Sequence, residues 1–187
     1  MTATDLCVLT DALAFAADKH RNHRRKDVEA SPYINHPIAL MHVLVHDGGV
    51  TNVTVLAAAL LHDTLEDTET TVEELTKRFG PEICKIVEEV TDDKTLPKAE
   101  RKRLQVEHAA KASHNAQLVK LADKISNLID ILDSPPAWEK ARKEQYFDWA
   151  RQVVAAVRGV NPAMEARFDT LYDRRKHLAG GQGPQSA

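Results

Sequence analysis

The 187-residue chain lacks most of the features that mark secreted, redox-active or membrane proteins. Its two cysteines, Cys7 and Cys84, are far apart and fit no metal-binding or redox motif, so we expect reduced thiols and a cytoplasmic location. No apolar run approaches the length of a membrane span, and the first residues lack the hydrophobic stretch of a secretory signal peptide. The sequence therefore predicts neither a membrane protein nor a thiolate-based site.

An excess of positive charge is also missing. Lysine and arginine number 25 against 28 acidic residues, and the formal net charge of −3 argues against a general nucleic-acid binder. Apolar residues make up 43% of the chain, as in ordinary soluble globular proteins. A chain of this length can bury a sizeable core within one domain. We expect neither nucleic acid nor membrane as a partner, and the sequence does not indicate an oligomeric state.

Period-two alternation of apolar and polar residues does not persist anywhere long enough to predict a sheet, whereas helical spacing recurs along most of the chain. We predict helices over residues 5–20, 37–48, 52–67, 71–80, 81–91, 98–111, 115–133, 138–158 and 162–178. No repeat or linker divides the sequence, so we predict a single all-α domain over residues 1–178. Residues 179–187 are rich in Gly, Gln, Ser and Pro and are predicted to be a disordered tail.

The most informative segment is HDTLEDT at residues 62–68. The apolar run before it predicts a helix that continues through the motif, so that four polar side chains share one half of the helix surface. These four are His62, Asp63, Glu66 and Asp67. Three carboxylates on one face repel each other unless a cation lies among them, and the histidine offers a divalent metal a nitrogen. The alternative is the solvated face of an amphipathic helix.

Two other segments place a ligand-type side chain at an unusual position. His36 stands directly before Pro37, at the predicted start of a helix, where the proline restricts its backbone. Asp123 interrupts a predicted apolar helix, and a buried carboxylate is costly unless it is paired or bound to metal. A surface or capping histidine and an aspartate paired with a nearby lysine are the alternatives. Together, His36, His62, Asp63 and Asp123 offer two nitrogens and two oxygens, a set that suits Mn, Fe or Zn better than Ca.

A histidine, a His-Asp pair and a later aspartate in this order are typical of the HD-domain metal phosphohydrolases. Four segments resemble more closely the hydrolase domain of RelA/SpoT proteins, in particular the stand-alone small alarmone hydrolases of metazoans. They are YINHP at 33–37, HDTLEDT at 62–68, VTDDKTLPKAERKRLQ at 90–105 and VKLADKISNL at 119–128. The resemblance covers residues 6–178, nearly the whole chain.

The resemblance implies an HD-type helical bundle with one manganese ion per chain, although the ligand set also permits iron or zinc. It implies hydrolysis of the 3′-diphosphate of guanosine tetra- and pentaphosphate, giving GDP or GTP and pyrophosphate. Glu66 and Asp67 are then expected to orient the attacking water or to act as its general base.

Substrate-binding residues are also expected from the resemblance. A basic loop over residues 20–26 contains Arg25, the expected base-stacking residue, and Lys26; a solvated loop is the alternative. The other expected contacts are Lys98, Asn127, Arg142 and Tyr146. Trp138 and Trp149 share the helix of the last two, and we interpret both as core residues. Relatives commonly carry arginine where this chain has Ile129, which puts in doubt any polar contact made at that position.

Two rival functions remain open. One is a phosphohydrolase of the same fold that cleaves another nucleotide, such as NADPH or a nucleoside monophosphate. The other is a catalytically silent nucleotide-binding regulator, which should lack a metal ligand or the acidic pair, whereas this chain keeps all six. No P-loop is present, and the chain ends where bifunctional relatives continue into a synthetase domain. We therefore expect a protein that only hydrolyses.

Overall fold

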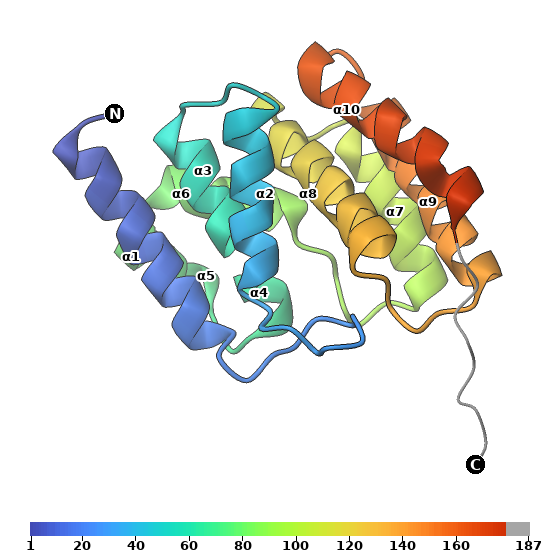
Figure 1. Cartoon of the computed structure of the whole chain (residues 1–187). Helices are drawn as coiled ribbons and strands as arrows, with labels where there is room; N and C mark the ends of the chain where they lie inside the picture. The colour runs from blue at the N-terminus through green and yellow to red at the C-terminus, as the bar shows by residue number, and fades with distance from the viewer. Residues whose placement is uncertain (179–187) are drawn as a thin grey trace.

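The structure, a computed structural model, describes residues 1–178, so the predicted tail at 179–187 lies outside the described residues. It is a bundle of α-helices closed by one short 3₁₀ helix (Figure 1). The helices are α1 (Ala3–Lys19), α2 (Asn35–His46), α3 (Val53–Leu61), α4 (Thr64–Asp67), α5 (Val72–Phe79), α6 (Pro81–Val90), α7 (Lys98–Ala109), α8 (His114–Asp133), α9 (Lys140–Ala156), α10 (Pro162–Asp173) and η1 (Arg174–His177). Within residues 1–178 there are two isolated β-bridges and no strand. The predicted all-α class is confirmed.

Two helices occupy the centre of the bundle. In α3, every residue from Val55 to Leu61 is buried, and the helix packs against α1, α2, α6 and α8. The longer α8 packs against α2, α3, α6, α9 and α10 and buries most of its length. Burying a Leu, Ile or Val side chain stabilises the fold by roughly 1.5–3 kcal/mol. The segments that carry His62 and Asp123 are therefore anchored by the core itself.

The chain breaks its helix at the HD motif, and the predicted continuous helix over 52–67 is wrong. The α3 helix ends at Leu61, and Asp63 lies in the bridge region, at φ −98° and ψ 1°, before α4 begins. The Thr64 hydroxyl donates to the Leu61 carbonyl oxygen at 2.6 Å. This local hydrogen bond offers the backbone an alternative to the helical pattern. His62 and Asp63 therefore occupy a corner between two helices.

Other helix boundaries differ from the predictions by a few residues. The α2 helix begins at Asn35, two residues before the predicted start, so His36 lies inside its first turn. Trp138 precedes α9 instead of opening it. The last predicted helix, over 162–178, divides into α10 and η1. The proposed limits of the domain, residues 1–178, stay a prediction.

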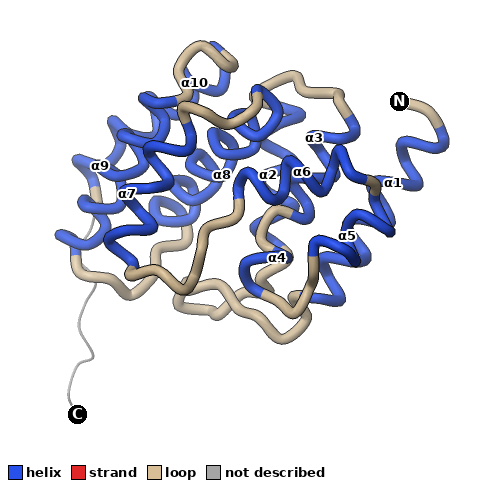
Figure 2. Tube along the Cα trace, turned by 180° about the vertical axis from the view of Figure 1, so that it is seen from behind, coloured by secondary structure: helices blue, strands red, loops and turns tan. Residues whose placement is uncertain are grey.

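Several connections gather at one end of the bundle. The α1–α2 loop, α4, the α6–α7 loop and the α8–α9 connector all lie along the lower edge in Figure 1, and Figure 2 shows the same grouping from behind. A backbone bridge between Asp27 and Pro136 joins the first of these loops to the last. The α1–α2 loop also closes on itself through a bridge between Arg24 and Pro32. Segments far apart in sequence thereby form one continuous rim.

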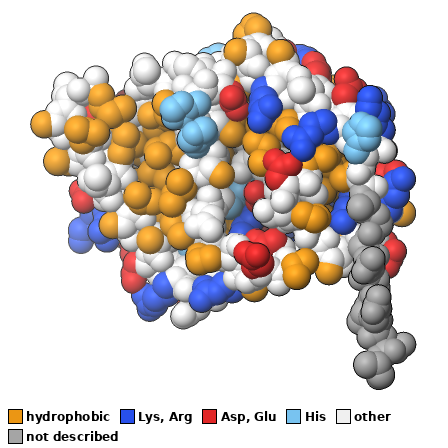
Figure 3. Space-filling model, viewed as in Figure 1, with side chains coloured by type: hydrophobic (Ala, Val, Ile, Leu, Met, Phe, Trp, Pro, Cys, Tyr) orange, Lys and Arg blue, Asp and Glu red, His pale blue; other side chains and the backbone are white. Residues whose placement is uncertain are grey.

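The surface differs between this end and the neighbouring face. Figure 3 shows apolar side chains gathered over α1 and α2, where Leu6, Ile38 and Val45 are exposed. Charged side chains of both signs lie along the lower edge, where the loops gather. None of the helices within residues 1–178 is both long and apolar enough to cross a membrane.

Candidate active site

Three of the predicted metal ligands converge from three different helices. His36 comes from α2, His62 from the end of α3 and Asp123 from α8, and their ligand atoms all lie within 4.8 Å of one another. His36 Nε2 is 3.2 Å from Asp123 Oδ1, and the two imidazole rings are 5.1 Å apart between centroids. Both histidines are buried. Two nitrogens and a carboxylate in one buried cluster are suitable ligands for a transition metal.

The hydrogen bonds behind the histidines orient their rings toward this cluster. His62 Nδ1 lies 2.9 Å from the Ala59 carbonyl oxygen, which assigns a proton to Nδ1 and turns Nε2 toward Asp123 and His36. His36 Nδ1 lies 3.3 Å from the Ser126 hydroxyl. His62 Nε2 is buried and makes no hydrogen bond of good geometry within residues 1–178. A metal ion would satisfy that nitrogen, so the residues present fit the group.

Asp63, the fourth predicted ligand, stands beside the cluster without being part of it. Its Oδ2 lies 2.9 Å from His62 Nε2, although the angles do not make this a hydrogen bond. The same oxygen accepts a hydrogen bond from the Tyr33 hydroxyl at 2.5 Å. Asp63 is thus next to the cluster through its contact with His62.

The charges of the cluster are coupled. Burial works against the charged form of Asp63, but His62 and His36 outweigh it and hold the pKa of Asp63 below its usual value. Burial likewise opposes ionisation of His62, yet Asp63 raises the pKa of His62 to about 9. Burial lowers the pKa of His36. Metal binding requires neutral imidazoles, so a divalent ion competes with the proton on His62.

Asp123 has a second partner in addition to His36. Lys124 Nζ lies 2.8 Å from Asp123 Oδ2, and the same ammonium group is 4.3 Å from the ring centroid of Trp149. Burial opposes ionisation, but Lys124 and His36 hold the pKa of Asp123 well below its usual value. The alternative raised by the sequence, an aspartate paired with lysine, therefore describes part of its environment. Both features coexist at this carboxylate.

The acidic pair on α4 has two contrasting environments. Glu66 Oε2 accepts a hydrogen bond from the Asp92 backbone at 3.1 Å, and burial raises the pKa of Glu66 to about 7. Asp67 instead forms an ion pair with Lys94, and its Oδ2 lies 3.4 Å from the Tyr33 hydroxyl. Two carboxylates with different environments can divide proton-transfer and electrostatic roles.

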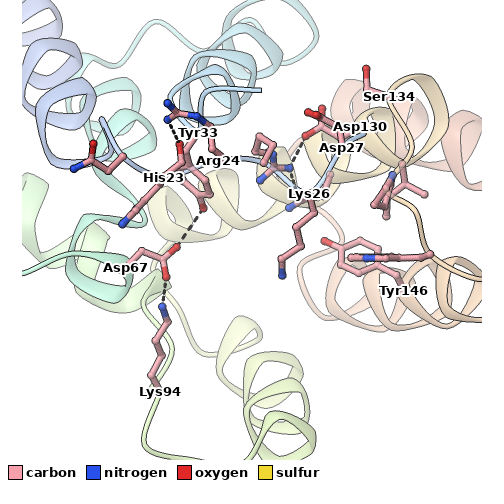
Figure 4. Close-up of a pocket in the computed structure, with 16 residues that line it drawn as sticks. His23, Arg24, Lys26, Asp27, Tyr33, Asp67, Lys94, Asp130, Ser134 and Tyr146 are labelled. Carbon is pink, nitrogen blue, oxygen red and sulfur yellow. Dashed lines mark hydrogen bonds and ion pairs between the residues drawn. The ribbon is translucent and has the colours of Figure 1, made fainter. Parts of the chain in front are cut away.

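Two cavities lie beside the acidic pair, the first lined by Asp67 and the second by Glu66. The first, of about 690 Å³, is lined by Arg25, Lys26, Asn127 and Tyr146 together with Tyr33 and Asp67, and Figure 4 shows it. The second, of about 560 Å³, is lined by Lys98 and Arg142 and also by Glu66. Lys26, Trp138 and Tyr146 line both. All six predicted substrate contacts therefore face one cavity or the other.

The second cavity is lined by both basic and aromatic side chains. Its lining contains five basic side chains, from Lys26, Lys98, Arg101, Lys102 and Arg142. Trp138 and Trp149 pack against the core, as predicted, but they also form cavity wall. Core packing is thus only part of what the two tryptophans do.

Arg25 is held by a network that the sequence did not predict. Its guanidinium forms an ion pair with Asp130 and donates to Asn127 Oδ1 at 2.9 Å. The Asn127 amide in turn donates to Asp123 Oδ1 at 2.6 Å. One chain of polar contacts therefore connects the basic loop with the ligand cluster. Ile129 packs against the core, so no polar contact is made there.

Tyr33, Lys124 and His20 belong to the site but were not singled out from the sequence. Tyr33 lies three residues before His36 and Lys124 directly follows Asp123. Closeness in sequence to a predicted metal ligand was the signal that could have identified these two residues. Burial, followed by the charge of Asp63, raises the pKa of Tyr33 and keeps its hydroxyl protonated. His20 stacks on the Tyr33 ring with centroids 4.7 Å apart.

His20 should make stability depend on pH. Burial, only partly offset by Asp63, lowers the pKa of His20 to about 4 from an ordinary 6.5. Between pH 6.5 and pH 4, His20 therefore binds a proton in the unfolded chain but not in the folded protein. The contribution of His20 to stability, which is fully present above pH 6.5, is lost as the pH falls toward 4. Between pH 7 and pH 5 the loss should be on the order of 2 kcal/mol.

Urea unfolding of metal-free protein at both pH values measures this effect. The His20→Gln variant should lack this contribution, and the exposed His114→Gln variant should retain it. His36, whose pKa is also lowered by burial, keeps its own contribution in both proteins. An equal loss of stability in His20→Gln and in wild type would show that His20 contributes nothing.

Comparison with known proteins places the chain in a family. An HD-domain family model matches residues 12–156. Guanosine-3′,5′-bis(diphosphate) 3′-pyrophosphohydrolase MESH1 of Danio rerio is 53% identical, over 94% of this chain and 98% of the relative. The Homo sapiens protein of the same name is 53% identical, over 89% of this chain and 94% of the relative.

A solved structure supports the same placement. It is described as a metazoan ortholog of SpoT that hydrolyzes ppGpp and plays a role in starvation responses. It superposes with a TM-score of 0.88 at 46% identity, covering 94% of this chain and 97% of that one. The resemblance found in the four sequence segments is confirmed, and the chain belongs to the HD-domain family, in the branch that contains MESH1.

Proposed function

We propose that this protein hydrolyses the 3′-diphosphate of guanosine tetra- and pentaphosphate, giving GDP or GTP and pyrophosphate, with one manganese ion per chain. The observation that carries the proposal is the convergence of His36, His62 and Asp123 beside the acidic pair of α4. It occurs in a chain about half identical, over nearly its whole length, to proteins named for this reaction. The same proposal places the protein in the cytoplasm, acting on a small nucleotide.

His36, His62, Asp63 and Asp123 are the residues that would hold the metal. When bound, a divalent ion supplies positive charge to the phosphoryl oxygens and lowers the pKa of a water molecule. The mixed nitrogen and oxygen ligands agree with manganese and also permit iron or zinc. Lys124 stays paired with Asp123 and keeps that carboxylate ionised.

The acidic pair and the basic side chains perform the remaining tasks. Glu66 or Asp67 orients the attacking water and accepts its proton. Arg25, Lys26, Lys98 and Arg142 balance the charge of the phosphates from the walls of the two cavities. Asn127 and Tyr146 line the first cavity, whose volume of about 690 Å³ is within the range of small-molecule sites.

A substrate panel tests the proposal. Metal-free protein is supplied with Mn²⁺ and then with guanosine tetraphosphate, guanosine pentaphosphate or NADPH, and the products are separated by anion-exchange chromatography. We expect GDP or GTP and pyrophosphate in equal amounts, and no turnover in excess chelator. Cleavage of NADPH alone would assign a different substrate, and nucleotide binding without turnover would support a silent regulator.

Arg25 is expected to contribute to substrate binding. The Arg25→Ala variant should raise KM by about 10- to 100-fold without changing metal content, because a hydrogen bond to a charged group contributes roughly 1.5–3 kcal/mol. Arg21→Ala is the matched control, because Arg21 pairs with Asp18 on the exposed surface and lines neither cavity. Steady-state kinetics of both variants measure the difference. Equal, small changes in KM would mean that the loop is only solvated surface.

A further inference from the structure

The hydroxyl of Tyr33 lies between two carboxylates of the site. It donates to Asp63 Oδ2 at 2.5 Å and lies 3.4 Å from Asp67 Oδ2. Figure 4 shows Tyr33 pointing at Asp67, while Lys94 reaches the same carboxylate from the opposite direction. One phenol thus connects the corner at the end of α3 with the end of α4.

The ring of Tyr33 is fixed by contacts that do not involve its hydroxyl. Its backbone N–H donates to the His23 carbonyl oxygen at 3.1 Å, and its carbonyl oxygen accepts from the His36 N–H at 3.0 Å. His20 stacks on the ring, and the Arg25 guanidinium lies 5.6 Å from its centroid. The loop therefore holds the ring in place, and the hydroxyl is free to act on the carboxylates alone.

The direction of the hydrogen bond has a chemical consequence. A carboxylate has two oxygens, and a donor fixed on Oδ2 of Asp63 sets the rotation of the whole group. Hydrogen-bond partners of metal ligands orient them, and losing one typically costs 10- to 100-fold in metal affinity or activity. A phenol held at this place can therefore align a ligand without touching the metal.

We propose that Tyr33 is a positioning residue, whose hydroxyl aligns Asp63 for metal binding and holds Asp67 at its working distance from the site. The first part concerns Asp63 alone. The second part rests on the proposed function, because it assigns Asp67 a role in turnover. The phenol has a single proton, which Asp63 accepts at 2.5 Å, so its contact with Asp67 Oδ2 at 3.4 Å is the weaker of the two. Lys94 pairs with the other oxygen of Asp67.

Metal affinity tests the first part without any measurement of activity. Metal-free Tyr33→Phe is titrated with Mn²⁺, and free Mn²⁺ is followed by electron paramagnetic resonance. We expect the dissociation constant to rise about 10-fold relative to wild type. Tyr172→Phe is the matched control, because the Tyr172 hydroxyl donates to Asp148 at 2.7 Å and the residue lines neither cavity of the site. Equal affinities in Tyr33→Phe and wild type, or no Mn²⁺ binding by wild type, would overturn this part.

Turnover at saturating Mn²⁺ tests the second part. For Tyr33→Phe we expect kcat to fall about 10-fold and KM to stay within about twofold of wild type, whereas Tyr172→Phe should change neither. In an Asp67→Asn background, the same substitution should cost less than about twofold, because the group that it positions is already altered. An unchanged kcat, or an undiminished loss in that background, would overturn the role assigned through Asp67. A wild-type protein that hydrolyses none of the nucleotides would refute the proposed function instead, and the Mn²⁺ titration would still decide the role at Asp63.

Discussion

The His62→Ala variant is expected to lose its bound metal and its hydrolase activity together. His62 is buried, its Nδ1 is engaged with Ala59, and its Nε2 lacks a hydrogen-bond partner within residues 1–178. Alanine removes that nitrogen from the cluster and leaves the carboxylates of Asp63 and Asp123 to repel each other. The loss of kcat should exceed about 100-fold, the upper end of what removing a partner of a metal ligand costs.

Metal content by plasma mass spectrometry and turnover of guanosine tetraphosphate measure this result on the same preparation. His42→Ala is the control, because His42 is a histidine on the exposed side of α2, stacked on His46. Circular dichroism establishes that both variants are folded. An active His62→Ala protein that retains one ion per chain would refute the ligand assignment.

The second large effect is expected at the acidic pair. Glu66→Gln and Asp67→Asn should each lower kcat by about 100-fold or more, as expected for loss of a positioned acid–base group, while metal content stays nearly intact. Both substitutions preserve the shape of the side chain. In Glu66→Gln, the new amide oxygen can still accept the hydrogen bond from the Asp92 backbone, so the position of α4 should not change.

Glu69→Gln provides the matched comparison, since Glu69 is exposed and lies just beyond the same helix. It should behave as wild type in kcat, KM and metal content. If Glu66→Gln and Asp67→Asn both keep near wild-type turnover, neither carboxylate is the general base, and the proton must leave by another route.

Three of the residues that form the ligand cluster could be predicted from the sequence, because few side-chain types bind a transition metal and their order along the chain limits the possible ligand sets. His36, His62 and Asp123 were selected as two nitrogens and a costly carboxylate, and the fold brings their ligand atoms within 4.8 Å. The all-α class followed from helical spacing in the same way. The four-ligand set and the roles of the acidic pair stay predictions, because they concern chemistry beyond the arrangement of the side chains.

The helix break at His62 and Asp63 could not be found from periodicity. The apolar spacing continues through the motif, and periodicity carries no trace of the hydrogen bond between the Thr64 hydroxyl and the Leu61 carbonyl oxygen that accompanies the break. The hydrogen-bond partners of Arg25 and Tyr33 also could not be predicted from the sequence. Arg25 contacts Asp130, which is 105 residues away in sequence, and Tyr33 contacts Asp63, which is 30 residues away. Such contacts form only when the helices pack together.

The convergence of ligands from α2, α3 and α8 also bears on how the protein survives in the cell. Any ion held there joins three helices whose ligands stand at positions 36, 62 and 123, and it does so only in the folded state. A ligand that binds only the folded state at 100 times its Kd adds about 2.7 kcal/mol to stability. The supply of free metal would then govern resistance to unfolding and proteolysis, so that the lifetime of the protein follows the metal status of its surroundings.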